Sequence, residues 1–248
     1  MTYDAVVLGE EVLAAAHTLA RRRAAGELGP DARVGFAGPT TMRPRRLALL
    51  LAAWGGSRAD ALTDPGTLPA VPRLGGRTLV LGGASSGKSA FAEALLAAEP
   101  QVTYLATGPR PAAEDADWAA RVARHRERRP AWWSTVESPD AALELTTPTP
   151  VLLDSVGTWL TAALDDCAAW QRPPGWRERL DERVEAFVEA WRARTGTVVA
   201  VSDEVGLGVV PATPAGRLFR ERLGALNERL AEASDRVLLV VAGQVTEL

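Results

Sequence analysis

Residues 78–96 read TLVLGGASSGKSAFAEALL. This stretch begins with an apolar run typical of a buried strand, continues through a glycine-rich turn and ends in a segment of helical composition. The turn, residues 82–89, matches G-x-x-x-x-G-K-[ST], a loop whose backbone N–H groups surround phosphates. Strand, loop and helix follow in the required order, so the stretch predicts a nucleoside triphosphate site.

The loop also contains Lys88, the only lysine of the chain. All the other basic residues among the 28 that are Lys or Arg are arginines. A compact ammonium group fits between phosphates better than a planar guanidinium does. We therefore expect Lys88 to be catalytic and the Ser89 hydroxyl to ligate Mg²⁺. The nucleotide-binding residues predicted in the loop are Gly82, Gly83, Ala84, Ser85, Ser86, Gly87, Lys88 and Ser89.

Composition limits the class of protein. The chain has 248 residues, 47% of them hydrophobic and 24% charged, which predicts one large globular domain or slightly more. A net charge of −3 argues against a nucleic-acid partner and favours small-molecule substrates. One cysteine excludes an internal disulfide, and with two histidines it cannot form an ordinary structural zinc site. The apolar stretch 47–54 is too short for a transmembrane segment and the start does not resemble a signal peptide, so we expect a cytoplasmic protein.

The first 75 residues are predicted to form a separate extension of unknown role. Residues 58–76 hold three prolines and three glycines without periodicity, which is typical of a linker. Upstream, the pattern predicts strands at 5–8 and 33–37 and helices at 10–24 and 45–54, with no candidate catalytic cluster. Because a linker implies few contacts across the boundary, a chain starting near Arg73 is expected to fold and remain active.

Downstream of the loop, strands and helices alternate. Strands are predicted at 102–107, 151–154, 197–202 and 237–242, the last of the chain, and helices at 115–129, 176–194 and 214–233. This order predicts an α/β, P-loop NTPase-like fold over residues 77–248, with a mainly parallel sheet covered by helices on both faces. Ligands bind at the carboxyl ends of such strands.

Acidic residues end two of these strands. Asp154 ends an apolar run, which is the position of the acid that holds Mg²⁺ in P-loop enzymes. The alternative is that Asp154 caps a helix over 155–164. Asp203 and Glu204 could orient a hydroxyl or a metal-bound water, or could be turn residues.

A basic segment, RVARHRERRP at residues 121–130, is predicted to be helical. Helical spacing would place Arg121, Arg128 and Arg129 around His125. Guanidinium neighbours disfavour imidazolium, so the ring would stay neutral and nucleophilic and could carry a covalent phosphoryl group. The alternative is a solvated basic helix with an incidental histidine.

Several motifs follow one another in the order of a known family. They are the loop GGASSGKS at 82–89, YLAT at 104–107, RVxxHRxxR at 121–129 with WxTxE at 133–137, LDS at 153–155 with WL at 159–160, VSDEVGxGVVP at 201–211, and RxFR at 217–220 with GxxN at 224–227. Over about residues 77–248 the chain resembles the bifunctional adenosylcobinamide kinase/adenosylcobinamide-phosphate guanylyltransferase family of cobalamin biosynthesis.

The resemblance implies two reactions. ATP or GTP phosphorylates the aminopropanol hydroxyl of adenosylcobinamide, and GTP then forms a guanylylated histidine that passes GMP to this phosphate, giving adenosylcobinamide-GDP. The resemblance implies that His125 is the GMP carrier and that the protein is a homo-oligomer. The nucleotide contacts that it implies, besides the loop, are Ala106, Thr107, Gly108, Arg126, Glu127, Arg128, Arg129 and Glu137, with Asp154 as the acid after the third strand.

The chain departs from the family pattern at three places. The family usually has arginine where Ser85 stands and asparagine where Asp203 stands, and residues 1–75 have no counterpart. Turnover or nucleotide preference is therefore expected to differ. Two alternatives stay open: a P-loop kinase of another small alcohol, in which His125 is structural, and a nucleotide-binding module that has lost catalysis.

Overall fold

The computed structural model describes residues 5–8, 12–29, 32, 34–37, 44–54, 76–108 and 116–248. Side chains are not described in strand residues 5–8 and 34–37 or at the helix positions 44–45, 116–118, 121, 124 and 128. The predicted linker therefore lies outside the described residues except for Gly76, and the boundary near residue 75 stays a prediction.

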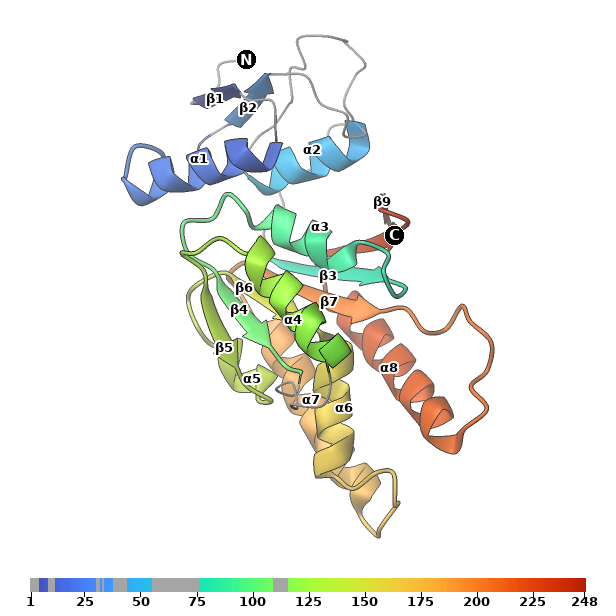
Figure 1. Ribbon diagram of the computed structural model, residues 1–248. Coiled ribbons are helices and arrows are strands. Elements are labelled where there is room, and N and C mark those ends of the chain that lie inside the picture. Colours follow the sequence, from blue (N-terminus) through green and yellow to red (C-terminus); the bar gives the residue numbers. More distant parts are fainter. Residues whose placement is uncertain are drawn as a thin grey trace.

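Seven strands form one sheet in the order β5-β4-β6-β7-β3-β8-β9 (Figure 1). Their bounds are β3 Arg77–Gly82, β4 Thr103–Ala106, β5 Ser134–Glu137, β6 Val151–Asp154, β7 Val198–Asp203, β8 Arg236–Val241 and β9 Gln244–Glu247. All neighbouring pairs are parallel except β8 and β9. The mainly parallel sheet confirms the predicted fold class.

Helices cover both faces of this sheet. They are α3 Lys88–Leu95, α4 Ala116–Arg128, α5 Ala141–Glu144, α6 Val156–Asp166, α7 Trp176–Ala193 and α8 Pro214–Glu232. Side chains of a strand point alternately to its two faces. Accordingly, Val80 of β3 packs in one buried cluster with α3, while Leu79 and Leu81 pack in a second cluster with α5, α6, α7 and α8. The site thus rests on a strand buried on both faces.

Three elements were missed by the sequence interpretation. Strand β5 is largely exposed at the sheet edge, so it lacks the apolar run that marks buried strands. Helix α5 is only four residues long. The prediction that 237–242 is the last strand was wrong, because Ala242 and Gly243 both have positive φ and turn the chain back into β9. That backbone suits a two-residue hairpin loop, in which alanine is an unusual residue.

The N-terminal segment forms two short parallel strands, β1 Ala5–Leu8 and β2 Val34–Ala37, and two helices, α1 Val12–Ala24 and α2 Pro44–Ala53. The expectation of few contacts with the rest of the chain was wrong. Helix α2 lies against α3, and side chains of both helices share its buried cluster (Figure 1). Trp54 Nε1 also donates to Ala94 O at 2.9 Å, and Arg23 Nη1 donates to Ala98 O at 3.3 Å. These side chains of the N-terminal segment thus donate to one carbonyl in the last turn of α3 and to one three residues beyond its end.

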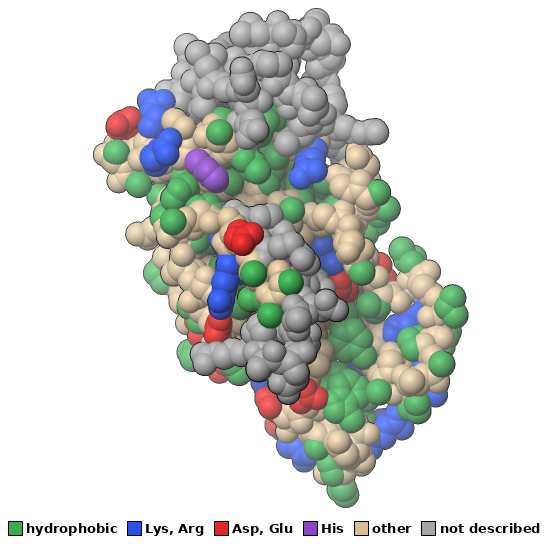
Figure 2. All heavy atoms as spheres, viewed as in Figure 1, with side chains coloured by type: hydrophobic (Ala, Val, Ile, Leu, Met, Phe, Trp, Pro, Cys, Tyr) green, Lys and Arg blue, Asp and Glu red, His purple; other side chains and the backbone are tan. Residues whose placement is uncertain are grey.

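The surface matches the balanced composition. On the face shown in Figure 2, acidic and basic side chains are interspersed, and aliphatic side chains gather where the loop between β7 and α8 lies. Leu207, Val209 and Val210 of this loop are exposed. Among the described residues, no helix is long and apolar enough to cross a membrane.

Candidate active site

The phosphate loop joins the end of β3 to the start of α3, at the carboxyl edge of the sheet. Its shape depends on two glycines. A Cβ on Gly82 would lie 2.5 Å from both Ser86 Oγ and Val240 O, and Gly87 has a φ of 93°. The loop is also tied to the neighbouring hairpin, because Gly243 N–H donates to Ser86 O at 2.8 Å. These constraints hold the loop in a defined shape at the start of α3, where a helix favours anions.

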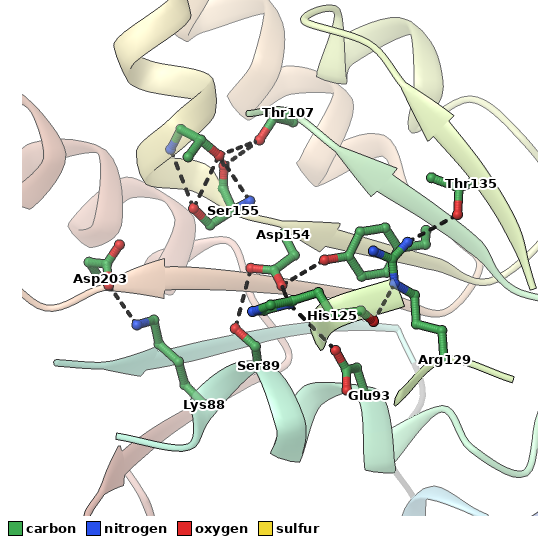
Figure 3. Close-up of polar contacts among 12 residues, drawn as sticks. Lys88, Ser89, Glu93, Thr107, His125, Arg129, Thr135, Asp154, Ser155 and Asp203 are labelled. Atoms are coloured by element: carbon green, nitrogen blue, oxygen red, sulfur yellow. Dashed lines mark hydrogen bonds and ion pairs between the residues drawn. The ribbon is translucent and has the colours of Figure 1, made fainter. Parts of the chain in front are cut away.

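Lys88 points across the sheet edge toward β7 (Figure 3). The residue is buried, and its Nζ lies 2.6 Å from Asp203 Oδ1 and 3.1 Å from Gly83 O. Glu204 does not join this pair, since its carboxylate accepts from Gly206 N–H at 2.6 Å within its own loop. The structure therefore brings only the first of the two predicted acids to the phosphate loop.

Asp154 lies between the phosphate loop and α4, and its two oxygens have different partners (Figure 3). Oδ1 accepts from Ser89 Oγ at 3.4 Å, and Oδ2 accepts from Tyr104 OH at 2.8 Å. Burial of the carboxyl raises its pKa, but the hydrogen bonds and charge of His125 and the hydrogen bonds of Tyr104 and Ser89 outweigh this, so the pKa is lowered. The negative charge is thus favoured where a cation would bind.

The alternative role of Asp154 as a helix cap was wrong. The N-cap of α6 is Ser155, whose hydroxyl accepts from Thr158 N–H, while the Thr158 hydroxyl accepts from Ser155 N–H. This reciprocal capping box shows that Ser155, and not Asp154, caps helix α6.

His125 reaches the site from α4, where it contacts two carboxylates that the sequence interpretation did not place beside it. Its Nδ1 lies 3.3 Å from Asp154 Oδ2 and 3.7 Å from Glu93 Oε1, so this nitrogen faces two carboxylates. Of the three arginines expected around His125, Arg129 is described: its Nε donates to His125 O at 2.9 Å, its Nη1 donates to Thr135 Oγ1 at 3.0 Å, and its guanidinium lies 3.5 Å from the centre of the Tyr104 ring. The side chains of Arg121 and Arg128 lie outside the described residues.

Two pockets lie near the site, one beside the end of α4 and strand β5, the other beside the carboxyl ends of β4 and β5 and helix α6. One has about 520 Å³ and is lined by Arg126, Arg129, Pro130, Ala131, Trp133, Thr135 and Glu137. The other, of about 270 Å³, is lined by Ala106, Thr107, Gly108, Glu137, Ser138, Pro139, Thr158, Thr161, Ala162 and Asp165. Glu137 borders both and pairs with Arg126 Nη2 at 2.9 Å. Most of the nucleotide contacts that the family resemblance implied outside the loop line one of these pockets.

Two further predicted residues that the structure describes, Thr107 and Glu127, do not contact Lys88, Asp154 or His125 through a hydrogen bond or ion pair of their side chains. Thr107 is buried and its hydroxyl donates to Ser155 O at 2.6 Å, so its side chain supports the start of α6. Glu127 is exposed on α4. Two groups at the site were not predicted, Glu93 and the Tyr104 hydroxyl. Glu93 follows Ser89 by four residues on α3, so it was detectable as a lone acid among apolar residues on the same helix face.

The oxygen atoms around Asp154 fit a magnesium ion. Mg²⁺ prefers carboxylate and hydroxyl oxygens, and Ser89 with Asp154 supplies one of each at the end of the phosphate loop. Glu93, His125 and Asp154 also offer ligand atoms that lie within 4.8 Å of one another. The donor set is therefore suitable for a divalent cation bound to phosphates.

A glycine-rich loop at the carboxyl edge of a parallel sheet, leading into a helix that begins with lysine, is the phosphate site of P-loop proteins. The chain is a member of that class.

Comparison with known proteins gives a narrower assignment. The family model for cobinamide kinase / cobinamide phosphate guanyltransferase matches residues 78–248, and the chain belongs to this family. The bifunctional adenosylcobalamin biosynthesis protein CobU of Salmonella typhimurium is 37% identical over 175 residues, which cover 66% of this chain and 95% of that protein. The corresponding CobP of Pseudomonas aeruginosa is 39% identical over 175 residues, covering 67% and 94%.

A solved structure of an ATPase from the type III secretion system of pathogenic bacteria was also matched. It is 14% identical, has a TM-score of 0.43, and the match covers 66% of this chain and 50% of that one.

Proposed function

We propose that this chain phosphorylates adenosylcobinamide with ATP or GTP and then transfers GMP from GTP to the product through a guanylylated histidine. The family match and the two curated relatives support both activities. The observation that carries the proposal is the position of Asp154, which contacts Ser89 of the phosphate loop through Oδ1 and His125 through Oδ2. One carboxylate thus joins the two sets of residues that the two reactions need.

In the kinase step, the loop N–H groups and the Lys88 ammonium would hold the transferring phosphoryl group. The acceptor hydroxyl attacks the γ-phosphorus and loses its proton to solvent, the bond from this phosphorus to the β-phosphate oxygen breaks, and the nucleoside diphosphate leaves. Positioned cations stabilise the charge that spreads over the phosphoryl oxygens. Ser89 and Asp154 would hold Mg²⁺, which neutralises phosphate charge when bound.

In the guanylyl transfer step, His125 would act as the nucleophile. Its Nδ1 faces Asp154 and Glu93, so we assign Nε2 as the atom that attacks the α-phosphorus of GTP. A P–N bond forms and pyrophosphate leaves. An oxygen of adenosylcobinamide phosphate then attacks the same phosphorus, the P–N bond breaks, and adenosylcobinamide-GDP is released with His125 restored.

The same proposal includes the division of the chain into domains, its oligomeric state and its location in the cell. Residues 77–248 would form the catalytic unit and residues 1–75 an extension that supports it. We also propose a cytoplasmic homo-oligomer that acts on small molecules and not on nucleic acid; the balanced composition and the biosynthetic names of the relatives support this.

Incubation with Mg²⁺ and GTP labelled at the α-phosphate tests the proposal. The protein should acquire one GMP through a bond that is acid-labile and base-stable, as a P–N bond is, and peptide mapping should place it on His125. His125→Ala should abolish the adduct and retain the kinase reaction. The other histidine of the chain, His17, lies on α1, and His17→Ala is the matched control that should retain both.

Other outcomes select the alternatives. Kinase activity on a different small alcohol, without any adduct, would indicate a plain P-loop kinase. Nucleotide binding without turnover of any substrate would indicate a module that has lost catalysis.

A further inference from the structure

The lysine of the phosphate loop already has an anionic partner within the protein. Lys88 Nζ lies 2.6 Å from Asp203 Oδ1, and the two side chains are 6% and 35% exposed. A second donor position of the ammonium is used by Gly83 O at 3.1 Å. An ammonium group has three donors, so two of them are directed to protein oxygens.

The pairing of strands and the packing around them fix the Asp203 carboxylate beside the phosphate loop. In the parallel pairing of β3 with β7, Asp203 is the register partner of Gly82, the first residue of the loop. The Asp203 backbone is held from the other side, since Asn227 Nδ2 donates to Asp203 O at 3.1 Å. Close packing also limits the side chain, because a Cβ on Gly157 would lie 3.3 Å from Asp203 Oδ2. The ion pair is therefore a defined part of the site.

A carboxylate in this position competes with phosphate. The loop lysine contacts the β- and γ-phosphates in P-loop proteins, and their oxygens need the same ammonium donors that Asp203 occupies. A carboxylate that stays near the loop also repels the bound phosphates. Nucleotide binding must either displace Asp203 from Lys88 or accept this repulsion, and both reduce affinity.

We propose that Asp203 determines the nucleotide affinity of this chain, by holding Lys88 as an internal ion pair that triphosphate has to displace. The inference rests only on the nucleotide-binding part of the proposed function. It gives Asp203 the role of an affinity-determining residue and assigns it no part in the transfer of a phosphoryl or guanylyl group.

The test compares Asp203→Asn with the matched control Glu204→Gln. Both changes remove one negative charge, at adjacent positions, but the Glu204 carboxylate is bonded to Gly206 N–H and has no contact with Lys88. Dissociation constants for ATP, GTP and inorganic tripolyphosphate are measured by calorimetry on the full chain. Asp203→Asn should bind all three about tenfold more tightly, because a buried or half-buried charge pair of this kind has a coupling of that order. Glu204→Gln should bind them as the parent does.

A third measurement separates competition from simple repulsion. In a Lys88→Ala background there is no ammonium to occupy, so adding Asp203→Asn should improve affinity much less than it does in the parent. An equal improvement in both backgrounds would show that Asp203 acts only by repulsion and would overturn the proposal.

Two other results would also overturn it. Unchanged or weaker binding by a folded Asp203→Asn variant would mean that the carboxylate supports the loop. A lower kcat with unchanged dissociation constants would place Asp203 at the acceptor or the metal. The binding assay needs no corrinoid, so tighter binding without cobinamide phosphorylation by either protein would uphold the inference while the proposed function fails.

Discussion

The N-terminal segment and the region from β3 to β9 are both built from parallel strands and helices, yet they serve different purposes. Every candidate site residue lies in the second region. The first contributes buried side chains, with Leu47, Leu50 and Trp54 no more than 2% exposed, and groups that donate to carbonyls at and just beyond the end of α3. The candidate site residues are thus confined to the second region, while side chains of both regions meet in one buried cluster through α3.

Removing the N-terminal segment should have the largest effect on the molecule. A chain starting at Arg73 exposes the face of α3 that Phe91, Ala94 and Leu95 share with α1 and α2. Each large buried side chain contributes roughly 1.5–3 kcal/mol, and whole domains are stable by about 5–15 kcal/mol. We expect the truncated chain to be insoluble or to lose its cooperative thermal transition, as monitored by circular dichroism. If it melts at the parental temperature, residues 1–75 do not stabilise the catalytic region.

Lys88→Ala should produce the converse result, a loss of chemistry with little loss of stability. The kinase rate should fall by about a hundred- to a thousandfold, since removing one preorganised donor to developing charge has this effect. The melting temperature should stay close to that of the parent, because the Asp203 partner is still one-third exposed to water.

Lys88→Arg is the companion variant for that experiment. It keeps the charge and changes the shape, so an equally low rate would show that the phosphates require a compact ammonium. Parental kinase turnover by either variant would remove the phosphate loop from the proposed mechanism.

Trp54→Ala tests the N-terminal contribution at a single residue. The loss of a fully buried tryptophan typically costs about 3–5 kcal/mol. The free energy of unfolding, measured with urea, should fall by that amount, while kcat of the remaining folded enzyme is retained. Trp54→Phe keeps most of the volume and removes only the donor to Ala94 O, so it should cost about 1 kcal/mol. Similar losses from both variants would locate the effect in the hydrogen bond rather than in packing.

Asp235→Asn should have the smallest effect, at the point where β3 begins. The backbone N–H of Arg77 donates to Asp235 Oδ2 at 2.7 Å, and with the Arg77 guanidinium it lowers the pKa of this carboxyl. A lowered pKa in the folded protein stabilises it above the unfolded pKa of about 3.9, and this contribution disappears as the pH falls through the folded value. The side chain is 44% exposed, so only a fraction of a kcal/mol is expected.

The stability difference between the parent and Asp235→Asn should therefore be measurable at neutral pH and vanish in acid. A difference that is the same at both pH values would contradict the electrostatic explanation.

Much of the catalytic region was predictable from sequence because its signals are local. The phosphate loop and the strands 151–154 and 198–203 are marked by glycine spacing and by apolar runs that reflect burial on both faces. Strand β5 carries no such signal because it lies at an exposed edge. The contacts of the N-terminal helices were not predictable, since a composition typical of a linker says nothing about whether the segments that it joins pack together.

The sequence by itself determined that the chain binds nucleoside triphosphate. The signal is a glycine-rich loop with one lysine, and all residues of this motif are adjacent in the sequence. Tertiary structure decided which groups surround His125 and Lys88. Helical spacing relates His125 to arginines near it in sequence, but it does not reveal Glu93 and Asp154, which approach its Nδ1 from α3 and β6. Asp203 reaches Lys88 only because β7 pairs with β3. Electrostatic environment depends on distances between segments remote in sequence, and only the packed sheet and its helices set those distances.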